Sequence, residues 1–187
     1  MLKILFIVIL SFNFAYACAL CGNGKASFVT VAMKAYLAED KIEKIHTQWK
    51  FDSGTSKDFK QLYSEKILAS DKKRMYDGLE NYQVPYFMTS IIINGKNISF
   101  KAENFDLSFD HNIVTIEFDI PLNYSLNDKN SVEIIFVDST KAIVFLENLD
   151  NLDISNSTNY TIKKANGFKV IKELVATVNY IKLEISK

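Results

Sequence analysis

Alternating apolar and polar positions run through most of the chain after about residue 28 and predict a protein built mainly of β-strands. Every second residue is apolar from 29 to 37, and the same period of two returns from 45 to 51. This period is typical of a strand with one buried face. The polar stretch at residues 39–41 lies between the two segments, so together they predict a β-hairpin.

The apolar spacing changes to a helical period after residue 52. A loop at residues 53–56 ends in Thr and Ser, which favour the first position of a helix. Apolar residues then stand at 59, 62, 63 and 67, which is the spacing of one helical face. A second short helix is predicted over 72–82, and Pro85 ends it. The pattern therefore predicts a short helical insertion around residues 57–85.

Strand patterns return at residue 86 and continue to the end of the chain. Asn94-Gly95 between two apolar runs predicts a two-residue hairpin turn, and another hairpin turns at 110–112. Further strands are predicted over 131–139 and 141–148, and a second Asn-Gly pair stands at 166–167. Several short, closely spaced strands favour a sandwich or barrel. We therefore predict one α+β domain over residues 18–187, mainly antiparallel β and sandwich-like.

The first seventeen residues, MLKILFIVILSFNFAYA, have the composition of a secretory signal peptide. Lys3 supplies a positive start, an apolar core follows, and Ala15-Tyr16-Ala17 is a small-x-small cleavage site. The apolar run is shorter than the ~20 residues needed to span a membrane. We therefore expect an exported, periplasmic protein that begins at Cys18. A lipid anchor on Cys18 is the alternative, although the bulky Tyr16 favours ordinary cleavage.

The composition is that of a globular protein without a global charge. Of its 187 residues 48% are apolar and 24% are charged, and 22 basic residues balance 22 acidic ones. No basic field is present to attract nucleic acid. We expect no nucleic-acid partner.

Cys18 and Cys21 form a Cys-x-x-Cys pair at the start of the expected mature chain. Two thiolates on one short loop suit nickel, zinc or Cu(I), and cleavage before Cys18 would add a free α-amine as a third donor. A disulfide or a lipid anchor explains the same residues in an exported protein. A thioredoxin-like role is disfavoured, because no strand precedes the pair once the signal peptide is removed.

The remaining chemistry of the sequence is sparse. His46 is expected on the polar side of its strand and is a candidate to complete a metal site with the cysteines, whereas His111 falls in a turn. Trp49 is either a core anchor or a binding platform. Neither a nucleophile elbow nor a His-Glu-x-x-His motif is present, and two histidines leave little room for general-base chemistry. We therefore predict a protein that is not an enzyme.

An ordered set of short motifs suggests a family. The first motif is Trp49-Lys50-Phe51-Asp52 followed by Ser56. The second is Tyr86-Phe87 before the strand with Asn94-Gly95, and the third is Phe136-Val137-Asp138. The set resembles family one-thousand-seven of bacterial exported proteins of unknown function. That family is labelled as a periplasmic component of an uncharacterised ABC-type transport system and is associated with nickel/cobalt permeases.

The resemblance implies a non-catalytic accessory of transition-metal transport, with an inner-membrane metal permease as its partner. It makes Trp49, Asp52 and Asp138 candidate binding residues and nickel or cobalt the candidate ion, and the Cys-x-x-Cys pair adds zinc to these candidates. The family's His-x-His motif is absent, because Lys25-Ala26-Ser27 stands in its place. A metal role would therefore depend on Cys18, Cys21 and His46. The alternatives are a metal-free structural or interaction module, a lipoprotein, and a thiol oxidoreductase.

Overall fold

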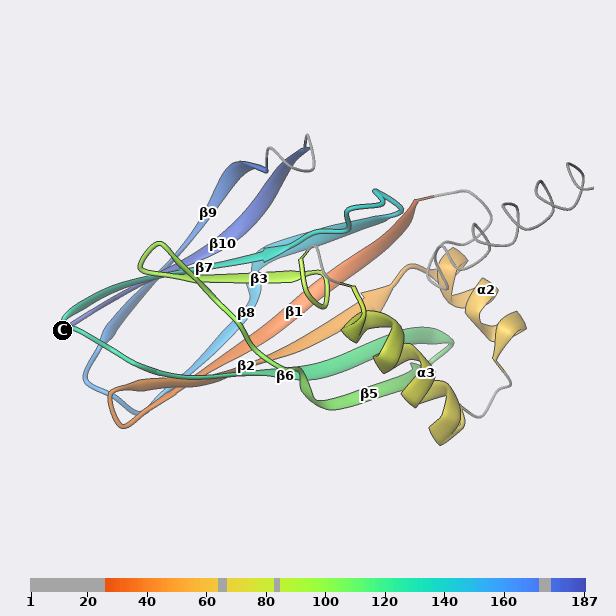
Figure 1. Cartoon of the computed structure of the whole chain (residues 1–187), viewed down its shortest axis with the longest axis horizontal. Coiled ribbons are helices and arrows are strands. Elements are labelled where there is room, and N and C mark those ends of the chain that lie inside the picture. Colours follow the sequence, from red (N-terminus) through yellow and green to blue (C-terminus); the bar gives the residue numbers. More distant parts are fainter. Residues whose placement is uncertain (1–25, 64–66, 83–84, 172–175) are drawn as a thin grey trace, which may run out of the picture.

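The structure is a computed structural model that describes residues 26–63, 67–82, 85–171 and 176–187. Over these residues two five-stranded sheets stack face to face, and two helices lie at one end (Figure 1). The predicted fold class, a mainly antiparallel α+β sandwich with a helical insertion, is confirmed.

The first sheet has the strand order β5-β6-β2-β1-β8. Its members are β1 (Ser27–Ala38), β2 (Lys41–Phe51), β5 (Glu103–Asp110), β6 (Ile113–Ser125) and β8 (Ile143–Asn156). Neighbouring strands are antiparallel except β1 and β8, which pair in parallel. This parallel pair is a feature that the alternating patterns alone do not predict.

The second sheet has the order β4-β3-β7-β10-β9, and all its pairs are antiparallel. Its members are β3 (Thr89–Ile93), β4 (Lys96–Ile98), β7 (Lys129–Phe136), β9 (Thr161–Ile171) and β10 (Ala176–Ser186). The last pair between β10 and β7 is Ile181 with Ile134, yet β9 and β10 stay paired beyond it. Residues 167–171 and 176–180 therefore leave β7 as a two-stranded projection, the β9–β10 arm (Figure 1).

The three predicted hairpins are confirmed, and each turns through left-handed residues. Positive φ angles occur at Glu39 and Asp40, at Asn94 and Gly95, and at His111 and Asn112. Two consecutive positive φ angles are typical of the tight turn whose twist matches antiparallel strands. The second Asn-Gly pair behaves differently: residues 166–167 lie within β9 and pair with β10.

The helices occupy α2 (Ser53–Leu62) and α3 (Ala69–Glu80), a little earlier than the predicted insertion. The shift has a local cause, because Asp52 caps α2 by accepting a hydrogen bond from the backbone N–H of Thr55 at 2.9 Å. Tyr76 of α3 donates to the carbonyl of Ala102, just before β5, at 3.1 Å. The helices thus lie beside β5 and β6 at the end of the sandwich (Figure 1).

The core lies between the sheets and consists of the inward positions of the strands. On β2 these positions are Ile45, Thr47, Trp49 and Phe51, all buried, as the period of two predicts. The alternate positions of the same strand face away from the core, and they build the site described next.

Candidate functional site

The outer face of β2 carries three polar side chains in succession, Lys44, His46 and Gln48. They alternate with the buried Ile45, Thr47 and Trp49, so the strand that anchors the core also presents these groups on its other side. His46 therefore lies on the polar face that the sequence predicts for it.

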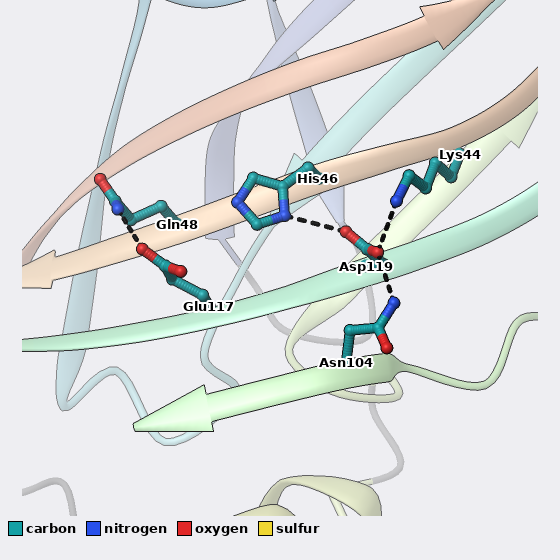
Figure 2. A network of polar contacts seen from close by, with 6 residues as sticks. All are labelled: Lys44, His46, Gln48, Asn104, Glu117 and Asp119. Atoms are coloured by element: carbon teal, nitrogen blue, oxygen red, sulfur yellow. Dashed lines mark hydrogen bonds and ion pairs between the residues drawn. The ribbon is translucent and has the colours of Figure 1, made fainter. Parts of the chain in front are cut away.

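Asp119 of β6 is the centre of the site, and its carboxylate joins three strands. It stands opposite His46 in the β2–β6 register. One oxygen bonds Nδ1 of His46 at 2.8 Å, and the other accepts from Nζ of Lys44 and Nδ2 of Asn104, also at 2.8 Å (Figure 2). Asn104 comes from β5, where a positive φ of 51° interrupts the β5–β6 register.

The electrostatics of the cluster keep Asp119 ionised. Only 4% of the residue is exposed, and burial alone would raise its pKa. The hydrogen bonds from Lys44, Asn104 and His46 outweigh burial and hold the pKa of Asp119 below its ordinary value. The same bond to Asp119 raises the pKa of Lys44. The carboxylate is thus a fixed negative charge, already matched by Lys44.

The imidazole of His46 is held at one nitrogen and left open at the other. Asp119 binds Nδ1, and Figure 2 shows the second ring nitrogen turned away from Asp119, toward the Gln48–Glu117 pair. The side chain is 38% exposed. With the Nδ1 proton donated to the carboxylate, Nε2 is the nitrogen that carries a lone pair for a ligand.

A second polar pair extends the site along the same two strands. Gln48 of β2 stands opposite Glu117 of β6, and its side-chain amide donates to the Glu117 carboxylate (Figure 2). Glu117 is therefore the acidic group nearest to the open side of His46 along β6. Its carboxylate lies on the side toward which the second ring nitrogen of His46 turns (Figure 2).

This arrangement offers one side-chain nitrogen to a ligand. In the described part of the chain, the ring of His46 hydrogen-bonds to Asp119. The described residues contain no group of three or more His, Cys, Asp or Glu side chains placed to hold a metal ion. His46 fits as one ligand of a metal ion, but a complete site needs donors from elsewhere.

Of the remaining candidate residues, those that the structure describes lie apart from this cluster. Cys18 and Cys21 fall outside the described residues. Asp52 is occupied as a helix cap: besides the N–H of Thr55, it accepts from the Thr55 hydroxyl at 2.7 Å and from the N–H of Phe28 at 2.9 Å. It thereby fixes the junction of β1, β2 and α2.

Asp138 likewise organises the backbone, in the turn between β7 and β8. It accepts from the N–H groups of Thr140, Ala142 and Ile143 at 2.8–2.9 Å, and from the hydroxyls of Thr140 and Tyr82. Burial alone would raise its pKa, but these bonds hold the pKa of Asp138 below its ordinary value. Its acceptor sites are filled from within the chain.

Trp49 is fully buried, which supports its role as a core anchor. Its exposed fraction is 0%, and it packs against the rings of Phe118, Phe136 and Phe145. His111 lies in the β5–β6 turn and is 95% exposed, with Nδ1 bonded to Asp110 at 2.6 Å. Unlike Asp119, this carboxylate is itself largely exposed.

Sequence reasoning missed one unusual carboxyl group, that of Glu147 on β8. It follows the buried Ile143 and Phe145 on the inward side of the strand and accepts a hydrogen bond from the N–H of Phe136 at 3.4 Å. Burial raises the pKa of Glu147 to about 8. The apolar alternation around it was the available signal, since it places position 147 on the inward face.

No described helix has both the length and the apolar character required to cross a membrane.

Comparison with known proteins adds little. No family model and no curated protein matches the chain, so the family resemblance stays a prediction. Among solved structures, AChBP from Bulinus truncatus is similar with a TM-score of 0.42 and 10% identity, over 97% of each chain. That likeness is too low to support a functional argument.

Proposed function

We propose that this protein is an exported, non-catalytic binding protein that assists transition-metal transport, with nickel or cobalt as its preferred ion. The observation that carries the proposal is His46, whose ring is fixed by a buried carboxylate while Nε2 is left open. A carboxylate behind the non-ligating nitrogen is the usual support of a metal-binding histidine, because it fixes the ring and its tautomer. Lys44 and Asn104 in turn hold Asp119 in place.

The described residues supply only some of the ligands that a metal ion needs, and this affects how such a protein would bind and release the ion. One imidazole with a neighbouring carboxylate gives modest affinity, and Lys44 already matches the charge of Asp119. Thiolates of Cys18 and Cys21, or groups of a partner permease, would supply the remaining donors. Such shared ligation suits transfer of an ion more than its storage.

The test is calorimetric titration of the reduced, exported protein with nickel, cobalt and zinc. We expect about one equivalent to bind, and Cys18→Ser with Cys21→Ser to abolish binding. His46→Ala and Asp119→Asn should each weaken affinity by about tenfold or more. His111→Ala is the matched control, because His111 also contacts an aspartate but on an exposed turn. Thermal unfolding of each variant separates lost ligation from lost folding.

Equal binding by wild type and His46→Ala would remove His46 from the site. Absence of binding by the wild-type protein would refute the metal hypothesis and favour a second candidate, a metal-free interaction module. That candidate has its own observation, the β9–β10 arm, on which Phe168 is 77% exposed and Val170 is 65% exposed. Exposed large apolar residues on a projecting element are a common feature of protein-binding surfaces.

A further inference from the structure

A shallow hollow lies on the outer face of the second sheet, far from the His46 cluster on the first sheet. Its volume is about 350 Å³, and its lining includes Asn94, Lys129, Ser131, Lys163, Glu184 and Ser186. These residues come from the β3–β4 turn and from β7, β9 and β10, next to the C-terminus and opposite the helices (Figure 1).

The positive charges of the hollow are available to a ligand. Among the described residues, the side-chain ammonium groups of Lys129 and Lys163 form no hydrogen bond or ion pair, although Lys163 interacts electrostatically with the neighbouring Glu184. In the strand register, Lys163 stands beside Glu184 and Lys129 beside Ser186, so the two lysines lie diagonally across β10. From ordinary strand spacing their Cα atoms are roughly 12 Å apart. Two lysine side chains can converge from that separation on one anion.

The rest of the lining is polar and firmly held. Asn94 accepts from the N–H of Ser131 at 2.8 Å and donates to the side chain of the buried Asn130 at 3.2 Å. The β3–β4 turn is thereby fixed against β7. Ser131 and Ser186 place side chains on the same outer face as the lysines, and serine hydroxyls can donate to an anion.

One carboxylate lies in the hollow, and it is already paired. Glu184 bonds Nζ of Lys182 at 2.9 Å. The lining of the hollow contains two lysines, Lys129 and Lys163, and one glutamate, Glu184, which leaves an excess of one positive charge. A phosphate group matches both this positive charge and the hydroxyl donors.

We propose that this hollow binds a phosphate group, either free or as part of a larger molecule such as an anionic lipid. Lys129 and Lys163 would supply the charge, and Ser131 and Ser186 would supply hydrogen bonds. The site is independent of the His46 cluster, so a test of phosphate binding does not decide the metal hypothesis.

The experiment titrates inorganic phosphate into isotope-labelled full-length exported protein and follows backbone amide shifts by NMR. We expect the amides of residues 129–131, 163 and 184–186 to move together. Lys129→Gln with Lys163→Gln should weaken binding roughly tenfold, in line with the loss of two surface charges. Lys50→Gln, which removes an exposed lysine from the outer face of the other sheet, should change nothing.

Glu184→Gln should change the affinity for phosphate in the opposite direction. It removes the one carboxylate of the hollow and releases Lys182, so phosphate should bind roughly threefold more tightly. A structural role of Glu184 would not tighten binding. Rising salt should weaken binding in every variant that retains the lysines.

A second arm identifies the source of the phosphate group by flotation with vesicles of phosphatidylcholine, with and without phosphatidylglycerol. Flotation that needs phosphatidylglycerol and is lost in the Lys129/Lys163 double variant supports the proposal, with a lipid head group as the ligand. Phosphate binding without flotation supports it with a soluble ligand. If wild type and double variant behave alike in both arms, the proposal is overturned.

Discussion

At the scale of single residues, Trp49 connects the two sheets. It projects inward from β2, and its ring lies 5.0 Å from that of Phe118 and 5.1 Å from that of Phe145, both in the first sheet. The ring of Phe136, in the second sheet, lies 6.1 Å away. The indole N–H of Trp49 has no partner among the described residues, so the residue acts through packing alone.

Trp49→Ala should therefore lower the free energy of unfolding by about 3–5 kcal/mol, because it opens a large cavity between the sheets. Trp49→Phe should cost clearly less, since no hydrogen bond is lost with the indole. Chemical denaturation followed by circular dichroism measures both. A change below about 1 kcal/mol for Trp49→Ala would show that the residue is not a core anchor.

Glu147 predicts an unusual dependence of stability on pH. Its pKa is about 8 in the folded protein against an ordinary value of 4.5, so the folded state holds the proton more tightly. Stability from this group is therefore retained below about pH 4.5 and falls as pH rises toward 8. The slope is at most about 1.4 kcal/mol per pH unit.

Glu147→Gln should abolish this fall and make the protein more stable than wild type at pH 8.5. The measurement is denaturant unfolding of both proteins between pH 5 and pH 8.5. Glu43→Gln, at an exposed position of β2, is the control and should follow the wild-type profile. Parallel profiles for wild type and Glu147→Gln would place the carboxyl of Glu147 in water.

At the scale of elements, local sequence signals predicted the turns correctly where backbone conformation alone determines the structure. The turn at Asn94-Gly95 needs two left-handed residues, and few residues other than Asn and Gly adopt that conformation readily. The same dipeptide at 166–167 lies in a strand, because there a contact with the neighbouring strand determines the structure. The ring of Tyr180, on β10, covers Gly167 where a side chain would otherwise stand.

Gly167→Ala tests that contact. A Cβ atom at this position would lie 2.2 Å from Cζ of Tyr180, so the ring must move. Because this ring is the far end of a side chain on the projecting arm, stability should fall by only about 1 kcal/mol. The loss should be smaller in a Tyr180→Ala background, which a double-mutant cycle measures. Gly78→Ala is the control, because a Cβ in that helix meets nothing within 4 Å and should stabilise by about 0.5–1 kcal/mol.

At the scale of the whole molecule, strand order decides which residues meet, and the sequence does not contain that order in any local signal. His46 and Asp119 are 73 residues apart and become neighbours only because β2 pairs with β6. The alternation on β2 predicted the face of His46 but not its partner. The position of β8 could not be predicted for the same reason, since it lies beside β1 through a parallel pairing.

The arm is the largest departure from a closed sandwich. Asn166 pairs with the buried Ile181, so alternation places Phe168 and Val170 on the side that elsewhere faces the core. Both are nevertheless mostly exposed, because β10 has left β7 at this point. Lys163 and Lys169 on the edge strand β9 hinder pairing with other strands. The apolar face of the arm is thus exposed in the described structure.

Phe168→Ser with Val170→Ser should leave the unfolding free energy of the isolated protein within about 0.5 kcal/mol of wild type, because these side chains bury little surface. The same variant should bind less of an apolar fluorescent dye and show an unchanged sedimentation coefficient. Val29→Ser is the contrasting variant, since Val29 is 0% exposed and its replacement should destabilise strongly. If the arm variant instead loses about 2 kcal/mol or more, or sediments as a smaller particle, Phe168 and Val170 are buried in solution against a second copy, and the face is already occupied.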